Sequence, residues 1–150
     1  MAGPDDLAAA YALRHEVFVV GQGVPQELER DDLDATAEHA LALCQGRVVA
    51  TGRLLDGGTD QDGLLVEGTQ GEVGTIGRMA VSATERGRGT GRAVLDLLVT
   101  RAQERGLPVV ELHAQVHARR FYERARFAAY GEVYLEAGIE HVAMRRELSP

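Results

Sequence analysis

The chain of 150 residues contains no tryptophan and a single cysteine, Cys44. One cysteine excludes an intramolecular disulfide and a thiolate metal cluster, and it suits the reducing cytoplasm. No apolar run reaches the roughly 18 residues that a membrane-spanning helix needs. The first residues also lack the basic and apolar segments of a secretory signal. We therefore expect a cytoplasmic protein without a membrane partner.

Basic residues are in the minority. The sequence has 16 basic side chains against 23 acidic ones, and its formal net charge is −7. Phosphate backbones are bound through basic surface, so nucleic acid is not the expected partner. One short stretch departs from this balance, because Glu85 is its only acid among Arg78, Arg86, Arg88 and Arg92. Local positive charge in an acidic protein indicates an anion site.

The spacing of apolar and turn-forming residues predicts helices and strands in mixed order. Helices are expected over residues 7–18, 90–105 and 118–124, and strands over residues 39–44, 47–55, 72–82, 109–113, 128–135 and 141–147. Two pairs of these strands flank short turn signals, at Gln45-Gly46 and at Ala137-Gly138, which predict hairpins. Hairpins mixed with strand–helix–strand units indicate a single α/β domain, an α+β mixed sheet with helices on its faces.

Three finer expectations concern these elements. Asp5 or Asp6 would cap the first helix. Residues 56–71 carry five glycines and are predicted to form an exposed loop. The helix over residues 90–105 would end at a Gly106 cap and turn inward the side chains of Ala93, Val94, Leu97, Leu98, Arg101 and Ala102.

A glycine-rich segment, Arg86-Gly87-Arg88-Gly89-Thr90-Gly91, lies between the predicted strand that ends at Val81 and the next helix. A helix start exposes unpaired N–H groups and the positive end of the helix dipole. Glycines let that backbone approach a ligand, and arginines can pair with phosphate oxygens. The segment therefore predicts an anion site, with a tight turn carrying solvated arginines as the alternative.

Two nucleotide-binding motifs fit this segment poorly. A P-loop needs Gly-Lys-Ser/Thr at the helix start, and the segment has no lysine. A dinucleotide fingerprint fits Gly87 and Gly89, but Arg92 occupies the position of its last glycine. Both nucleotide interpretations are therefore weak.

Several segments resemble motifs of the GNAT acyltransferases. The family's Gln/Arg-x-x-Gly-x-Gly/Ala motif, its cofactor-pairing strand and the Phe-Tyr of its last helix are matched by Arg86-x-x-Gly89-x-Gly91, residues 77–81 and Phe121-Tyr122. More narrowly, the chain resembles the ElaA-like branch of the family at residues 13–22, 113–115 and 138–141. These blocks follow the family's order across nearly the whole chain.

The resemblance implies a fold, a cosubstrate and a reaction. The fold is the GNAT acyl-CoA N-acyltransferase fold, whose central sheet splays beside the strand that ends near Val81. The cosubstrate is acetyl-coenzyme A, whose pantetheine arm pairs with that strand. Its acetyl group passes to a primary amine of a small molecule or peptide by direct attack in a ternary complex. The implied cofactor-binding residues are Met79, Ala80, Val81, Arg86, Gly87, Arg88, Gly89, Thr90, Gly91 and Arg92.

Acyl transfer to an amine needs a proton donor for the leaving thiolate and a base for the amine. By resemblance Tyr122 is the donor, with a purely packing role as the alternative. The base is left open among Glu111, His113, His117 and a chain of water molecules. Strand alternation places Glu111 and His113 on one face. A backbone N–H near Val81 would polarise the thioester carbonyl.

The sequence departs from the family's pattern in three places. Gly21 stands where the ElaA-like branch usually has glutamate, and Arg126 where the family usually has a glycine before Phe127. If that turn needs a positive φ, Arg126 is strained there. No strand is predicted before the first helix, so either the sheet lacks its first strand or the natural chain starts upstream.

Two further groups of residues have plain interpretations. The acids Glu27, Glu29, Asp31, Asp32 and Asp34 are interpreted as a solvated loop face, and the alternative is attraction of a cationic amine. The five histidines show no metal-ligand spacing, so no metal site is expected.

Two other functions are left open by the sequence. One is a non-catalytic acyl-coenzyme A sensor, which keeps the anion site without turnover. The other is a partner-binding domain without a ligand, which coenzyme A would not stabilise against heat. A homodimer is left open as well.

Overall fold

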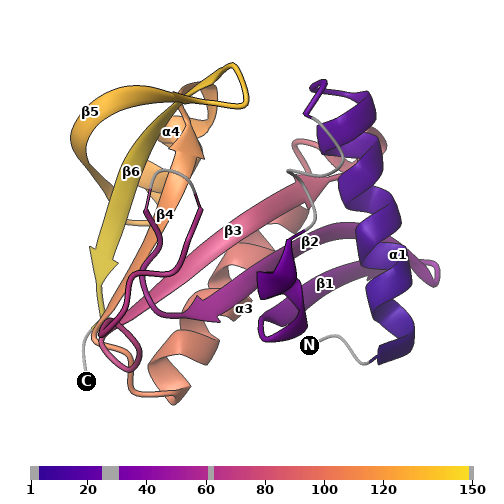
Figure 1. Cartoon of the computed structure of the whole chain (residues 1–150). Helices are drawn as coiled ribbons and strands as arrows, with labels where there is room; N and C mark the ends of the chain where they lie inside the picture. The colour runs from indigo at the N-terminus through magenta and orange to yellow at the C-terminus, as the bar shows by residue number, and fades with distance from the viewer. Residues whose placement is uncertain (1–3, 25–30, 61–62, 149–150) are drawn as a thin grey trace. The chain divides into compact units, whose positions relative to one another are not determined.

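The computed structural model of the chain describes residues 4–24, 31–60 and 63–148. Figure 1 labels the main helices and strands. The helices are α1 (Pro4–Arg14), α3 (Thr90–Glu104) and α4 (Arg119–Arg124). The strands are β1 (Glu38–Cys44), β2 (Arg47–Asp56), β3 (Val73–Val81), β4 (Val109–Gln115), β5 (Ala128–Glu136) and β6 (Ile139–Glu147). These bounds confirm the predicted order of elements.

The strands form one mixed sheet of six, in the order β1-β2-β3-β4-β6-β5. β1 and β2 are antiparallel, as are β4 with β6 and β5 with β6. β3 and β4 are parallel, and their register joins Val73–Thr75 to Val109–Glu111. The α+β mixed sheet expected from the sequence is thereby confirmed.

The chain divides into two compact units. The first joins Met1–Leu54 to Arg78–Leu98, and the second joins Leu55–Gly77 to Val99–Pro150. The cofactor-binding residues implied by the family resemblance all belong to the first unit. The proposed proton donor and base candidates all belong to the second unit.

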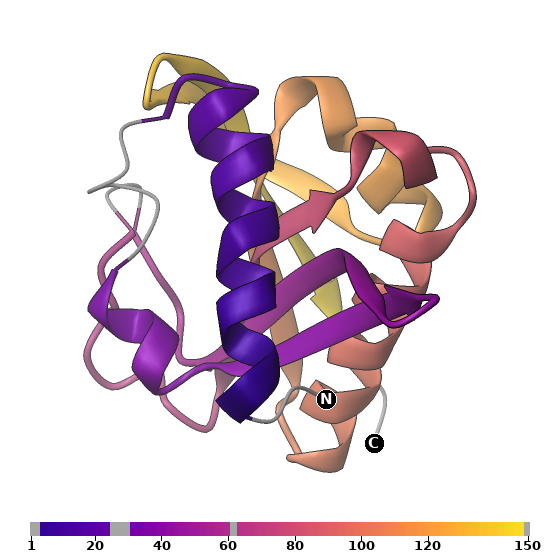
Figure 2. The ribbon, with the colours of Figure 1, turned by 90° about the vertical axis from the view of Figure 1, so that its right-hand side faces the viewer.

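In the first unit, α1 lies across β1 and β2 (Figure 2). Leu13 and Val17 form a buried cluster with Ala80 of β3, and Phe18 and Val48 pack against it. Because burying apolar surface contributes about 25 cal/mol per Å², this contact holds the helix on the sheet. The helical path continues past α1 as a π-helical turn over His15–Val20.

Two expectations about helix detail were wrong. α1 begins at Pro4, whose fixed φ suits the first turn of a helix, so the predicted cap at Asp5 or Asp6 lies inside the helix. In α3 the predicted inward residues Ala93 and Leu97 are exposed. Buried instead, with the correctly predicted Val94, Leu98 and Ala102, are Leu95 and Val99. The apolar stripe has a different helical phase from the one read off the sequence.

The two predicted hairpins are confirmed, and the reason lies in their turns. Gln45 and Gly46 have φ angles of 52° and 79° and join Cys44 to Arg47. Ala137 and Gly138 repeat this with φ angles of 52° and 77°. Two successive positive φ values define the tight turn whose twist matches that of the flanking strands.

The second unit is built on alternation along β4, whose buried residues are Val110, Leu112 and Ala114. Glu111 and His113 lie on the opposite, half-buried face, as predicted. The expected exposed loop over residues 56–71 was partly wrong, because Gly57, Gly58 and Thr59 are buried. No helix in the described ranges is long and apolar enough to cross a membrane.

Candidate active site

The glycine-rich segment that is predicted to bind an anion lies between β3 and α3. Gly87 and Gly89 have φ angles of 82° and 81°, which disfavour side chains, and the space beside each is open. The Gly89 carbonyl accepts the Ala93 N–H at 3.0 Å, so Gly89 caps the helix. The start of this 15-residue helix, with the positive end of its dipole, therefore lies directly after the glycine turn.

The Thr90 hydroxyl adds a second sign of a ligand. Its Oγ1 atom is shielded from solvent and has no hydrogen-bond partner among the residues that the structure describes. A buried polar atom without a partner is unusual in a folded protein and costs free energy. An oxyanion seated on the start of α3 would supply the missing partner.

The arginines of this segment are surface residues. Arg88 lies 3.9 Å from Glu85, and Arg92 donates to Asp96 across one helical turn at 2.9 Å. Exposed pairs of this kind contribute at most about 1 kcal/mol and are easily exchanged. Arg86 is exposed as well. Pairing of Arg86 or Arg88 with a phosphate would therefore cost the fold little.

The strand before the anion site carries a local irregularity. Arg78 is a non-glycine residue with a φ of 52°, which breaks the extended backbone of β3. Ala80 is buried at 2% exposure, whereas Met79 and Val81 are half-buried. The Ser82 N–H donates to the Val49 carbonyl at 2.8 Å and fixes the end of the strand.

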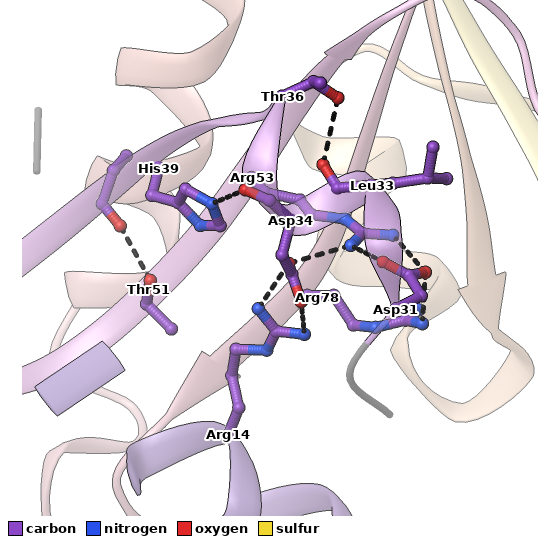
Figure 3. Close-up of polar contacts among 10 residues, drawn as sticks. Arg14, Asp31, Leu33, Asp34, Thr36, His39, Thr51, Arg53 and Arg78 are labelled. Atoms are coloured by element: carbon purple, nitrogen blue, oxygen red, sulfur yellow. Dashed lines mark hydrogen bonds and ion pairs between the residues drawn. The ribbon is translucent and has the colours of Figure 1, made fainter. Parts of the chain in front are cut away.

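A network of ion pairs includes Arg78 of this strand (Figure 3). Arg14 binds both oxygens of Asp34, at 2.7 and 3.1 Å. Arg53 binds Asp34 at 2.9 Å and both oxygens of Asp31, at 2.7 and 3.1 Å. Arg78 reaches the second Asp31 oxygen at 3.3 Å. The network ties α1, β2 and β3 to the helical turn Asp32–Ala35.

This network corrects the interpretation of the acidic segment. Burial raises the pKa of Asp34, but Arg14 and Arg53 outweigh it and hold that pKa below 3.8. Arg53 and Arg78 likewise outweigh burial and lower the pKa of Asp31. These two acids are therefore neither a solvated face nor free to attract a cationic amine.

Two other acids of that segment, Glu27 and Glu29, lie outside the described residues. Asp32 belongs to a helical turn over Asp32–Ala35. In the part of the chain that is described, no group of three or more histidines, cysteines or acids could hold a metal ion.

Tyr122, the predicted proton donor, is buried against two phenylalanine rings. Its side chain is 9% exposed, and its ring packs edge-on against Phe121 and Phe127, with ring centroids 5.0 and 6.2 Å away. Burial raises the pKa of Tyr122 to about 12, so the phenol keeps its proton at neutral pH. No hydrogen bond of its hydroxyl is found within the described ranges.

The three base candidates have different surroundings. Glu111 accepts a hydrogen bond from the Tyr130 hydroxyl at 3.0 Å. His117 is exposed, with its Nε2 atom 2.5 Å from the Gln115 side-chain oxygen. Only His113 is both half-buried and held at both of its ring nitrogens.

Sequence reasoning missed one of the residues that hold His113. The Tyr134 hydroxyl lies 2.5 Å from His113 Nδ1. The rings of Tyr134 and His141 are stacked, with centroids 5.9 Å apart. The available signal was the spacing of Tyr130 and Tyr134 around Gly131, but no sequence rule shows that both tyrosines reach β4.

The departure at Arg126 is confirmed as a strained position. Arg126 has a φ of 71°, in the left-handed region that disfavours residues with a side chain. Its N–H donates to the Glu123 carbonyl at 2.9 Å, and the Phe127 N–H donates to the Tyr122 carbonyl at 3.1 Å. The turn that ends α4 thus keeps the geometry of a glycine turn without the glycine.

Comparisons with known proteins identify the family of the chain. The model of the acetyltransferase (GNAT) domain family matches residues 9–148, and the chain therefore belongs to the GNAT N-acetyltransferase family. Escherichia coli ElaA is 34% identical over 95% of this chain and 88% of that protein. YjcF of Bacillus subtilis, described as an uncharacterized N-acetyltransferase, is 30% identical over 95% of this chain and 94% of that protein.

Solved structures give the same result. An acyl-CoA N-acyltransferase from Pseudomonas aeruginosa has a TM-score of 0.80 and 36% identity, covering 97% of this chain and 92% of its own. The crystal structure of Escherichia coli ElaA has a TM-score of 0.78 and 31% identity, covering 97% and 93%. The fold is that of the GNAT acyl-CoA N-acyltransferases, and the narrower resemblance to the ElaA-like branch is confirmed.

Proposed function

We propose that the protein transfers the acetyl group of acetyl-coenzyme A to a primary amine of a small molecule or peptide. The amine attacks the thioester directly while both substrates are bound. The observation that carries this proposal is the start of α3, where Gly87 and Gly89 leave open space and Thr90 has an unpaired hydroxyl. Since Cys44 is a free thiol, we place the reaction in the reducing cytoplasm.

The proposed cofactor site needs only groups of the first unit. The N–H groups at the start of α3 hold the pyrophosphate, and Arg86 and Arg88 add charge. The backbone of Met79, Ala80 and Val81 pairs with the pantetheine arm as an added strand would. The free N–H groups and the open space match an elongated, phosphate-bearing ligand.

The proposed chemistry uses Tyr122 as the proton donor. A thiolate leaving group has a pKa of about 8.5, and a phenol that is still protonated at neutral pH can donate to it. Two observations support this role, the raised pKa of Tyr122 and the absence of a hydrogen bond to its hydroxyl from the residues that the structure describes.

Release of coenzyme A tests the proposal. Acetyl-coenzyme A is mixed with the protein and, in turn, an amino acid amide, a lysine peptide, a polyamine and an amino sugar, while free thiol is measured. Amine-dependent thiol release supports the function. Without release, a thermal shift with coenzyme A would identify a sensor, since a ligand at about 100 times its Kd adds about 2.7 kcal/mol. If coenzyme A gives neither thiol release nor a thermal shift, the remaining interpretation is a partner-binding domain without a ligand.

A further inference from the structure

A chain of polar contacts runs through the second unit from β5 to the loop after β2. The Tyr134 hydroxyl contacts His113 Nδ1 at 2.5 Å, and His113 Nε2 contacts the Thr59 carbonyl oxygen at 3.2 Å. Tyr134 and His113 are both half-buried. The ring is thus held at both nitrogens, between a hydroxyl and a carbonyl.

These contacts determine where the protons lie. A carbonyl oxygen only accepts, so His113 Nε2 carries the hydrogen that it donates to Thr59. In the neutral ring Nδ1 then holds a lone pair, and the Tyr134 hydroxyl donates to it. The basic nitrogen of His113 can therefore be reached by a proton only through the tyrosine oxygen.

Tyr134 reaches β4 because β5 is irregular. Between Tyr130 and Tyr134 the β5 register shifts, since these residues pair with Ala143 and His141 of β6. Three residues of β5, 131–133, thus face one residue of β6, Val142, and Gly131 adopts a φ of 77° in the bulge. Both tyrosines extend across to β4, where Tyr130 contacts Glu111 in the way that Tyr134 contacts His113.

The two tyrosine pairs end in different classes of base, a carboxylate in one and an imidazole in the other. A neutral imidazole accepts a proton at one ring nitrogen while it donates from the other, so it can take up a proton without losing its anchoring hydrogen bond. The contacts of His113 have this arrangement, with Nε2 on the Thr59 carbonyl and Nδ1 on the Tyr134 hydroxyl. The histidine pair is therefore the one that suits a relay.

We propose that Tyr134 and His113 form a relay that takes the proton from the acceptor amine. This inference rests on the proposed acetyl transfer. The ammonium gives a proton to the Tyr134 oxygen as the tyrosine's own proton passes to His113 Nδ1. The resulting imidazolium keeps its Nε2 hydrogen bond to Thr59 and later releases the added proton to water.

The remaining steps balance the reaction. The free amine forms the carbon–nitrogen bond, and the carbon–sulfur bond then breaks. The thiolate takes its proton from Tyr122, and the second proton lost by the nitrogen restores Tyr122. One acetylated amine, one free thiol and one released proton result for each ammonium consumed.

The surroundings favour a hydroxyl that passes protons without staying ionised. Burial, followed by the nearby Glu136 and Tyr130, raises the pKa of Tyr134. Tyr134 also stacks on His141, whose Nε2 atom lies 3.7 Å from Glu136. A tyrosine hydroxyl that is still protonated can accept another proton only if it gives up its own. Tyr134 must therefore pass its proton to His113 as it receives the proton of the amine.

The relay is tested by the pH dependence of kcat/KM for the amine that gives the fastest thiol release. Wild type is compared with Tyr134→Phe, His113→Gln and the matched control Tyr130→Phe, from about pH 6 to about pH 9. Without the relay only amine already deprotonated in solution reacts. The kcat/KM of Tyr134→Phe should then be at least roughly tenfold below that of wild type at neutral pH, and it should approach the wild-type value as the pH rises. His113→Gln should behave in the same way, and Tyr130→Phe should follow wild type.

Other results would overturn the relay. If kcat/KM of Tyr134→Phe is reduced by the same factor at every pH, Tyr134 has a structural role. If Tyr130→Phe has a low kcat/KM at neutral pH that recovers at high pH, the base is Glu111 instead of His113. Nitrogen NMR of His113 gives a readout that needs no turnover. We expect a hydrogen on Nε2 in wild type and a changed Nδ1 signal in Tyr134→Phe, and a hydrogen on Nδ1 in wild type would contradict the relay. Failure of the proposed function would instead appear as wild type without amine-dependent thiol release.

Discussion

Arg14 and Asp34 lie twenty residues apart in the sequence and form two hydrogen bonds, at 2.7 and 3.1 Å. The Arg14 side chain is 1% exposed and that of Asp34 is 7% exposed. Arg53 shares the same carboxylate at 2.9 Å. Two guanidinium groups thus surround one buried carboxylate. We therefore expect the stability of the protein to depend strongly on this pair.

Replacing Arg14 with methionine should destabilise the protein strongly. The variant leaves Asp34 with Arg53 alone, and removing one partner of a buried ion pair costs about 3–5 kcal/mol. Urea unfolding measures the change. The control Arg119→Met removes an exposed pair with Glu123 and should cost under about 1 kcal/mol. Similar losses for both variants would contradict the structural importance of the network.

The same network predicts loss of stability in acid. The pKa values of Asp31 and Asp34 are lower in the folded state than the ordinary 3.8. Their stabilising contribution is therefore complete above about pH 4 and is lost as the pH falls through the folded-state values. Urea unfolding between about pH 5 and about pH 2 should show this decline. Asp34→Asn removes one of the two titrations, and an equally steep decline in that variant would refute this origin.

Cofactor affinity should depend on Gly89. Replacing it with valine places a branched side chain in the space beside the helix start, and we expect a Kd for acetyl-coenzyme A at least roughly tenfold weaker. Gly68 also has a positive φ, of 83°, and open space beside it. Gly68→Val is therefore the control for backbone strain, and calorimetry should find its affinity unchanged. Equal affinities for both variants would remove the anion site from the proposal.

The hydroxyl of Tyr122 should matter for turnover alone. Tyr122→Phe keeps the ring packed against Phe121 and Phe127 and removes only the proton. If it is the donor, kcat should fall by roughly 10²–10⁴-fold with little change in acetyl-coenzyme A affinity. Steady-state thiol release, with Tyr130→Phe as the control, measures this. A loss within a few-fold would leave Tyr122 with a packing role.

The sequence predicted local features well, because neighbouring residues determine them. Gln45-Gly46 and Ala137-Gly138 favour one tight turn whatever surrounds them, and both hairpins formed where expected. The phase of α3 was less certain from sequence, since Leu95 and Leu97 are equally apolar and only packing decides which is buried. The glycine-rich anion site combined a turn signal with a helix start, and both were found.

Contacts between distant residues were beyond sequence reasoning. Asp31 and Asp34 read as members of an acidic loop, yet their partners come from residues 14, 53 and 78. Tyr134 was overlooked because the register shift in β5 cannot be read from composition. The resemblance to the family identified Tyr122 as a candidate, and position in the sequence left the base open among Glu111, His113, His117 and water. The hydrogen bonds that distinguish His113 from Glu111 and His117 come only from the fold.

The central claim is acetyl transfer from acetyl-coenzyme A to a primary amine, and the most direct measurement is mass spectrometry of the product. Acetyl-coenzyme A with an isotopically labelled acetyl group is incubated with the amine panel, and acetylated amine and free coenzyme A are quantified together. The account predicts one labelled acetylamine for each coenzyme A released, with both products reduced at least roughly tenfold in Gly89→Val when the cofactor is well below its Kd. Coenzyme A bound without any labelled amine would contradict the claim.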